Sequence, residues 1–146
     1  MIGEKIYEYV CDMTENIDFG VGLEALLSGQ VKPPLHGARF DAHFEGTVEG
    51  RISGRISGCD FAFMRPDGNI ELNIHARIDL GGGKLIALAA GGVGLWRSGE
   101  PVLDLSENVR LTTAHADFDW VNGRQIWATG NADLGAGKIV LAGYMQ

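Results

Sequence analysis

The longest regular pattern in the chain is a strict alternation of apolar and polar residues from Ile70 to Leu80. Apolar residues occupy every even position, and polar or charged residues occupy the odd ones. A β-strand with one face toward a core has this period of two, whereas a helix does not. The preceding turn RPDG (65–68) places Pro and Gly where a tight turn needs them, and Gly68 is expected to adopt a positive φ. Segment 59–80 is therefore predicted to be an antiparallel hairpin.

Further strand signals are short and are separated by glycine-rich turns. Segment 14–35 lacks a strand signal and is predicted to be a long early connection with one helical turn at 23–27. Segment 85–95 is interpreted as a buried strand pair bent at Gly91–Gly92. About eight or nine strands at this spacing, with almost no helix, are typical of an all-β sandwich or barrel. The other predicted strands are 5–13, 38–47, 109–121, 124–132 and 138–145.

Glycine is unusually frequent, since the 22 glycines are about twice the usual share. Gly46, Gly50, Gly54 and Gly58 recur every fourth residue, the last three within the tandem repeat EGRISGRISG, and an extended chain places all four on one face. Glycine on a packed face lets a strand bend sharply or lets a neighbouring strand approach closely. We therefore predict a single closed antiparallel β-barrel domain spanning residues 1–146, because closure also removes exposed sheet edges.

Charge and apolar content exclude two classes of partner. The net charge is −7 and the pI about 4.9, without a basic stripe, so no nucleic-acid partner is expected. The most apolar segment, 85–95, is shorter than the roughly 20 residues of a membrane helix, so no membrane partner is expected. Cys11 and Cys59 form no CxxC motif, and the first residues do not resemble a signal peptide. We expect reduced, packed thiols and a cytoplasmic location.

Three sequence blocks occur in an order that resembles a known family. They are the glycine ladder leading into GCDF (58–61), then RPDG (65–68) followed by Glu71–Leu72, and FDWVN (118–122). The set resembles domain-of-unknown-function family 3237, whose members are small β-barrel proteins. The resemblance covers most of the chain from residue 38 onward. It implies a small closed barrel, often oligomeric, and no established activity.

The chain also departs from that family's pattern. Phe61 stands where the family usually has Trp, and the tract 87–90 is apolar where the family is usually polar. Asn73, His75 and Ala76 replace the frequent Asp, Arg and Tyr. If these family positions line a pocket, the pocket of this chain is chemically different.

Candidate catalytic residues are His43, His75 and Asp60. Each histidine lies on the polar face of a predicted strand, with carboxylates at neighbouring positions of the same face. If both faces were lumenal, the imidazoles and carboxylates could transfer protons or bind a metal. The alternative is a solvated outer face, which the inward packing of apolar side chains in small barrels favours. No metal and no cofactor are predicted.

Candidate ligand-binding residues are Arg65, Phe118 and Trp120. Phe118 and Trp120 share one parity and could line a pocket, with Arg65, Asp60 or Asp119 at its rim. The alternative is that these aromatic side chains pack in the core. Sequence alone does not separate the two interpretations.

The sequence is compatible with three kinds of function. The first is a barrel that binds a small apolar metabolite in its interior or at its mouth. The second is a cofactor-independent isomerase or cyclase that uses the same cavity with one acid or base. The third is a structural oligomer without a ligand. The apolar segments 70–80 and 85–95 together exceed what one barrel is expected to bury, which predicts a homodimer or higher homo-oligomer.

Overall fold

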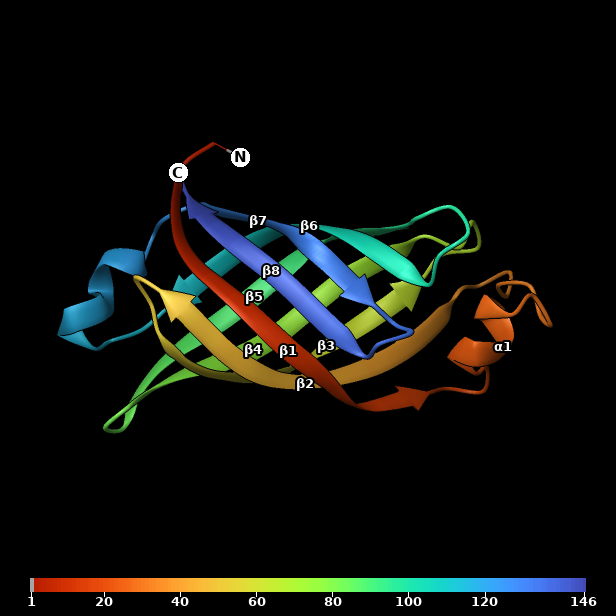
Figure 1. The fold of residues 1–146 in the computed structure, drawn as a ribbon, viewed down its shortest axis with the longest axis horizontal. Helices are drawn as coiled ribbons and strands as arrows, with labels where there is room; N and C mark the ends of the chain where they lie inside the picture. Colours follow the sequence, from red (N-terminus) through yellow and green to blue (C-terminus); the bar gives the residue numbers. More distant parts are fainter. Residues whose placement is uncertain (1) are drawn as a thin grey trace.

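A computed structural model describes residues 2–146 and shows eight antiparallel strands closed into one barrel (Figure 1). Each strand pairs with the next along the chain, and β8 pairs with β1 to close the sheet. The predicted fold class, a closed antiparallel barrel, is confirmed. The elements are β1 (Glu4–Asp18), α1 (Leu23–Leu27), β2 (Ala38–Gly50), β3 (Gly54–Met64), β4 (Ile70–Gly81), β5 (Lys84–Trp96), β6 (Val102–Thr112), the 3-10 helix η1 (Ala116–Val121), β7 (Ile126–Asp133) and β8 (Lys138–Met145).

The alternation that predicted the hairpin of β3 and β4 determines which face of β4 is buried. Ile70, Ile74 and Ile78 point into the barrel and are at most 5% exposed. Glu71 and His75 point outward and are exposed. The turn before β4 also has the expected conformation, because Gly68 has a φ of +90°.

Inward-facing glycines allow the strands to pack closely around a narrow barrel. A Cβ on Gly92 would lie 2.0 Å from the carbonyl oxygen of Ser106, and one on Gly130 would lie 2.0 Å from that of Val140. No side chain fits at such distances, so these positions require glycine. The four-residue glycine repeat is divided by the tight turn at 51–53, which joins β2 to β3.

The segment predicted as a strand over 109–121 is corrected by the structure. Strand β6 ends at Thr112, and residues 116–121 form η1 instead. The side chain of Asn122 accepts a hydrogen bond from the Thr113 backbone N–H at 3.0 Å and donates one to its carbonyl at 2.7 Å. These two bonds close the loop and direct Val121 into the barrel, where it is fully buried. The apparent alternation of FDWV therefore belongs to the 3-10 helix η1 at the end of the barrel, not to a strand.

Two other predicted boundaries also change. Segment 85–95 is one continuous strand, β5, not a bent pair: Ile86 and Leu88 are buried inward, whereas Leu85 and Leu95 face outward and are 44% and 50% exposed. The early connection is shorter than predicted, because β1 continues to Asp18 through an irregularity between Met13 and Glu15. The helical turn at 23–27 is found as α1.

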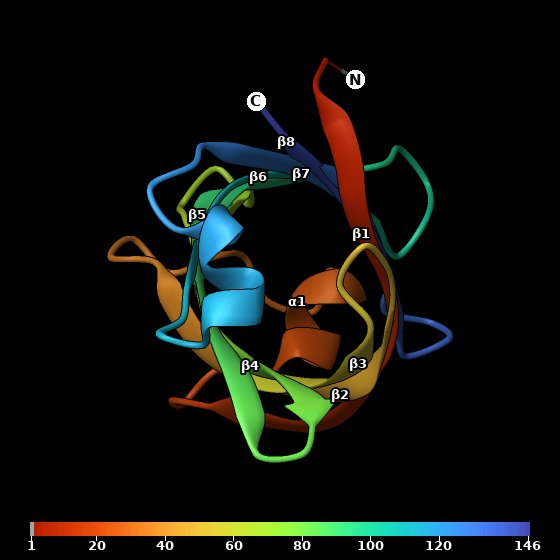
Figure 2. The same cartoon turned by 90° about the vertical axis from the view of Figure 1, so that its left-hand side faces the viewer.

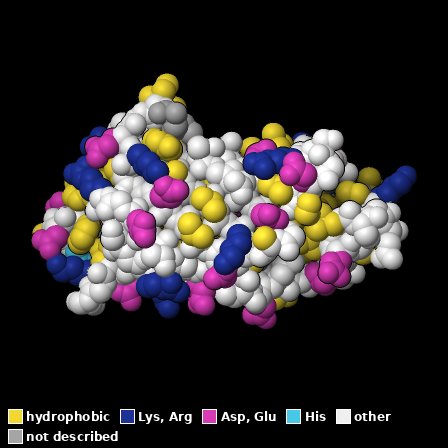
Figure 3. All heavy atoms as spheres, in the orientation of Figure 1, with side chains coloured by type: hydrophobic (Ala, Val, Ile, Leu, Met, Phe, Trp, Pro, Cys, Tyr) yellow, Lys and Arg dark blue, Asp and Glu magenta, His cyan; other side chains and the backbone are white. Residues whose placement is uncertain are grey.

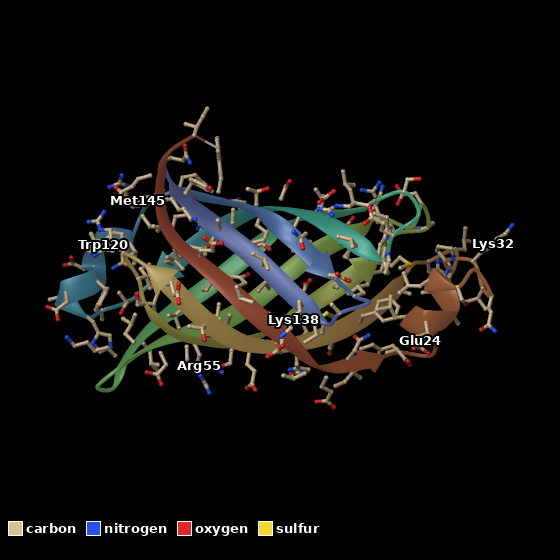
Figure 4. All side chains as sticks on the ribbon, in the orientation of Figure 1. Glu24, Lys32, Arg55, Trp120, Lys138 and Met145 are labelled. Carbon is tan, nitrogen blue, oxygen red and sulfur yellow. The ribbon has the colours of Figure 1, made fainter. Side chains whose placement is uncertain are left out.

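The two helical segments lie at opposite ends of the barrel. Figure 1 shows α1 at one end and the loop containing η1 at the other, and the view along the barrel in Figure 2 places η1 in front of α1. In Figure 4, Lys32 and Glu24 lie at the α1 end and Trp120 lies at the η1 end. Within residues 2–146, neither helical segment is long and apolar enough to cross a membrane. On the face seen in Figure 3, acidic and basic side chains are interspersed.

Candidate functional site in the barrel interior

An interior cavity of about 80 Å³ occupies the half of the barrel nearer to α1. Its walls are mainly apolar and include Phe40, Leu72 and Leu105, with Asp60 and Glu107 among its few polar groups. Leu23 of α1 and Trp96 at the end of β5 border it on the α1 side. Within the described residues, no Lys, Arg or His lines this space.

The space exists because several inward positions in this half carry small side chains. Ala42, Ala62 and Ala132 line the cavity, from three different strands. Protein interiors otherwise fill to the density of organic crystals, so alanine at these positions leaves room that a larger residue would occupy. The cavity is therefore a consequence of side-chain volume on an ordinary barrel backbone.

Glu107 places a carboxyl group inside this apolar space. It faces inward from β6, is 6% exposed, and its Oε2 has no hydrogen-bond partner among the described residues. Its neighbours across the sheet are Gly92 on β5 and Ala128 on β7, so no large side chain flanks the carboxyl. Burial raises the pKa of Glu107 to about 8, and the negative charge of Asp60 adds to this effect. At neutral pH, Glu107 is mainly protonated and can donate a hydrogen bond.

Asp60 is the second interior carboxyl group and differs from Glu107 in its bonding. Its Oδ1 accepts a hydrogen bond of 2.9 Å from the backbone N–H of Asn73 on β4. Pairing of β3 with β4 is interrupted between the Asp60–Ile74 and Phe63–Glu71 pairs, and the carboxylate replaces the missing backbone partner of Asn73. Burial raises the pKa of Asp60 to about 6, although the N–H of Asn73 opposes the shift.

Two tyrosines lie beside these carboxyl groups. Tyr9 lines the cavity, and its ring stacks on those of Tyr7 and Phe44, with centroids 6.0 and 6.5 Å away. The Tyr7 ring fills the space where Gly143 lacks a side chain, and its hydroxyl is buried with no partner among the described residues. Burial and the charge of Glu107 raise the pKa of both tyrosines, which therefore remain neutral donors.

Unpartnered polar atoms in the interior call for an explanation. Native proteins satisfy the large majority of buried polar side-chain atoms, so exceptions often mark an unseen water, ion or ligand. The hydroxyl of Tyr7 and Oε2 of Glu107 are such exceptions. Tyr7 and Glu107 lie in one row across the sheet, separated only by Gly143 and Ala128.

The predicted histidines lie outside the barrel. His43 and His75 flank Cys59 in one row across β2, β3 and β4, and all three line an open groove on the outer surface. Asp60, in contrast, faces the cavity, so the structure does not bring the three catalytic candidates together. Within residues 2–146, no cluster of His, Cys, Asp and Glu has the arrangement of a metal site.

The predicted ligand-binding residues do not meet either. Arg65 lies in the β3–β4 turn at the α1 end, where it forms an exposed ion pair with Asp67. Phe118 and Trp120 belong to η1 at the other end, and the guanidinium of Arg51 lies 3.8 Å from the centre of the Trp120 ring. None of the three predicted residues borders the interior cavity.

Sequence reasoning missed Glu107, although a signal was present. On β6, the inward positions read Leu, Leu, Glu, Val, Leu from 103 to 111. A charged residue within the apolar parity of a strand is a recognisable anomaly, because burying an unpaired carboxylate is costly. Asp60 interrupts the inward parity of β3 in the same way.

Comparisons with known proteins establish the fold. No family model matches the chain, and no curated protein is significantly similar to it. A solved protein of unknown function from Clostridium acetobutylicum has a TM-score of 0.79 at 17% identity, covering 97% of this chain and 96% of the other. A beta-barrel-like protein from Acinetobacter baumannii has a TM-score of 0.77 at 17% identity, covering 99% and 94%. An enzyme from Penicillium herquei has a TM-score of 0.61 at 14% identity, covering 99% and 95%. At these identities, the likeness shows a shared fold.

Proposed function

We propose that the barrel binds a small, largely apolar molecule in its interior, with a polar group of that molecule bonded to Glu107. The observation that carries this proposal is a buried carboxyl group with an unpartnered oxygen in a mainly apolar cavity. An unsatisfied buried polar group costs about 1–3 kcal/mol. A ligand with one hydrogen-bonding group and an apolar body would recover that cost and fill the space.

The size of the cavity limits the ligand. A volume of about 80 Å³ lies well below the roughly 300–1,000 Å³ of sites for drug-sized ligands. A compact molecule of a few carbon atoms fits this proposal as the barrel stands. A larger one requires the α1 end to open.

Trp96 separates the cavity from the outside at that end. It borders the cavity on one side and a surface groove of about 540 Å³ on the other. Its indole N–H donates a hydrogen bond of 2.7 Å to the carbonyl of Gly68. Helix α1, which also lines both spaces, contains no buried residue. Movement of Trp96 and α1 would therefore join the groove to the cavity at small cost.

The surroundings of this entrance favour an apolar ligand. Four large apolar side chains of the β1–β2 connection are exposed to solvent: Phe19 (60%), Leu27 (41%), Val31 (42%) and Leu35 (83%). Of these four, Leu27 lines the groove beside Trp96, so an apolar molecule would meet a compatible surface there before it reaches the interior.

A second function, a cofactor-independent isomerase or cyclase, is supported by the pair of carboxyl groups. Acids and bases with pKa values near the working pH are the most effective at proton transfer. Burial brings the pKa values of Asp60 and Glu107 to about 6 and about 8, on either side of neutrality. That one similar barrel is an enzyme agrees with chemistry in such an interior, by analogy of fold.

Binding is tested by titrating the protein with cyclopentanone and following backbone amide shifts by NMR. We expect perturbations at residues that line the cavity. Ala62→Leu should abolish them by filling the cavity, whereas the matched variant Ala89→Leu, on the outer face of β5, should bind like the wild type. Native mass spectrometry of the purified protein would identify a retained ligand. Perturbations that persist in Ala62→Leu would contradict interior binding.

A further inference from the structure

The two interior carboxyl groups come from strands that are not neighbours in the barrel. Asp60 lies on β3 and Glu107 on β6, with β4 and β5 between them, yet both border the same cavity. The charge of Asp60 also raises the pKa of Glu107. A molecule in the cavity would therefore meet one carboxyl group on each of two walls.

The hydrogen bonds make these groups chemically different. The N–H of Asn73 points at Oδ1 of Asp60 and stabilises its charged form. Oε2 of Glu107 receives no such donor and lies among apolar groups, which favours its protonated form. Near neutral pH, the pair accordingly consists of one base and one acid. Two carboxyl groups with different environments are a recurrent arrangement for proton transfer.

We propose that the barrel catalyses proton transfer at a carbon next to the carbonyl of a small neutral ketone, with Asp60 as the base and Glu107 as the donor to the carbonyl oxygen. This inference rests on the proposed function, because it requires the ketone to bind in the cavity.

The reaction proceeds in two balanced steps. The Asp60 carboxylate removes a proton from the α-carbon, and the electron pair of that C–H bond forms a carbon–carbon double bond. The electron pair of the carbonyl π bond moves to oxygen, which receives the proton or hydrogen bond of Glu107. In the second step, the carbonyl double bond re-forms, the electron pair of the carbon–carbon double bond takes the proton of Asp60 at the α-carbon, and Glu107 recovers its own proton. No oxidant, reductant or cofactor is consumed.

The lining of the cavity selects a neutral carbonyl compound as the substrate class. Without a Lys, Arg or His among the described lining residues, a phosphate or carboxylate would enter without a counter-charge. A protonated carboxyl and a tyrosine hydroxyl are donors, and Tyr9 borders the same space. Donors bind a carbonyl oxygen and stabilise the negative charge that develops there when the α-proton leaves. The apolar walls accept the carbon skeleton.

The test follows the exchange of cyclopentanone α-protons for deuterium in D₂O by proton NMR, with binding measured in the same samples. We expect the wild-type chain to accelerate exchange. General-base catalysis contributes about 10²–10⁴-fold, so Asp60→Asn should lose at least 100-fold. Its amide oxygen can still accept the Asn73 N–H, which preserves the fold. Glu107→Leu should lose at least 10-fold, and Glu107→Gln, which retains a donor, should lose less than Glu107→Leu.

Glu71→Gln is the matched control, because Glu71 is an exposed carboxylate on the outer face of β4. It should exchange like the wild type. Binding of cyclopentanone without accelerated exchange would overturn the catalytic inference and leave the proposed function standing. Absence of both binding and exchange would overturn both. Equal losses in Glu71→Gln and Asp60→Asn would overturn the assigned role of Asp60, since surface carboxylates would then account for the exchange.

Discussion

The two halves of the barrel share the same strands but differ in how they are filled. On three strands, an inward position toward η1 carries a large aliphatic side chain, whereas an inward position toward α1 carries alanine. The corresponding pairs are Val48 and Ala42 on β2, Ile56 and Ala62 on β3, and Ile126 and Ala132 on β7. The large member of each pair is at most 1% exposed. The location of the cavity is thus set by side-chain volume at inward positions.

The two ends of the barrel also differ in how firmly they are closed, and the end nearer to the cavity is the less firmly closed one. At the η1 end, Val121 is fully buried and Asn122 is bonded twice to Thr113. At the α1 end, the helix has five residues and none is buried. Because local opening is easiest where few apolar contacts are lost, the α1 end is expected to open first. One half is thus tightly packed and closed, and the other contains the cavity in which we propose that a ligand binds.

The largest effect that tests this comparison concerns Glu107 and pH. Its pKa in the folded protein is about 8, raised from an ordinary value of 4.5, so the folded state holds the proton more tightly. The stability that this proton confers is complete below about pH 4.5 and is lost as the pH rises toward 8. At about 1.4 kcal/mol per pKa unit, the wild type should lose on the order of 4 kcal/mol relative to Glu107→Gln over this range.

Urea unfolding from pH 5 to pH 8.5 measures that difference. The groups facing Glu107 are Asp60, Tyr7 and Tyr9, and of these only Asp60, with a pKa of about 6, also titrates in this range. An Asp60→Asn background therefore removes this second titration, together with the smaller part of the Glu107 pKa shift that the charge of Asp60 causes. Glu71→Gln should follow the wild-type curve. If the free energy of unfolding changed with pH in parallel for the wild type and Glu107→Gln, the Glu107 carboxyl would be solvated and water would occupy the cavity half.

A matched pair of leucines on β6 compares the packing of the two halves directly. Leu111 is 2% exposed and lies away from the cavity, whereas Leu105 lines it. Leu→Ala in a core costs about 2–5 kcal/mol. We expect Leu111→Ala to fall in the upper part of that range and Leu105→Ala in the lower part, because one side of Leu105 already lacks packing partners. Equal losses in urea unfolding would mean that both halves are packed alike.

The sequence predicted the fold because the barrel depends on local patterns. Alternation in β4, the RPDG turn and closely spaced glycines are each readable within a few residues. The end of β6 was mispredicted because it depends on the bonds between Asn122 and Thr113, which no alternation pattern encodes. Similarly, β5 appeared bent because Gly91–Gly92 resembles a turn, whereas Gly92 provides close approach to β6.

The candidate site was only partly predictable. The sequence identifies Asp60 as a candidate together with His43 and His75, because alternation gives two faces of a strand without stating which is interior. The apolar parity of β4 already placed His75 on the other face. Glu107 was overlooked because its strand was only partly recognised, so its anomalous parity was not visible. The gathering of Asp60 and Glu107 depends on barrel closure between distant segments, which a single sequence does not reveal.

Trp96 provides a smaller test at the entrance of the cavity half. Trp96→Phe removes the indole N–H that bonds to the Gly68 carbonyl, at a cost of about 1 kcal/mol. Entry and exit of cyclopentanone should become faster, which NMR line shapes report. Trp127 lies on the outer wall and is 44% exposed, so Trp127→Phe should change neither the stability nor the rate of ligand entry and exit. Unchanged exchange rates in Trp96→Phe would show that the ligand enters elsewhere.

The smallest expected effect concerns Gly68, whose carbonyl holds Trp96. Its φ of +90° is unfavourable for other residues, while no atom lies within 4 Å of a Cβ placed there. The cost of Gly68→Ala, about 1 kcal/mol, should therefore come entirely from backbone conformation. Pro66→Ala in the same turn should cost less, since it mainly adds freedom to the unfolded chain.

If the entrance depends on this turn, Gly68→Ala should also speed ligand exchange, and combining it with Trp96→Phe should add little further acceleration. Fully additive effects on the ligand exchange rate would show that the turn and Trp96 act independently. They would indicate that Trp96 is held by packing against the cavity wall instead of by its bond to Gly68.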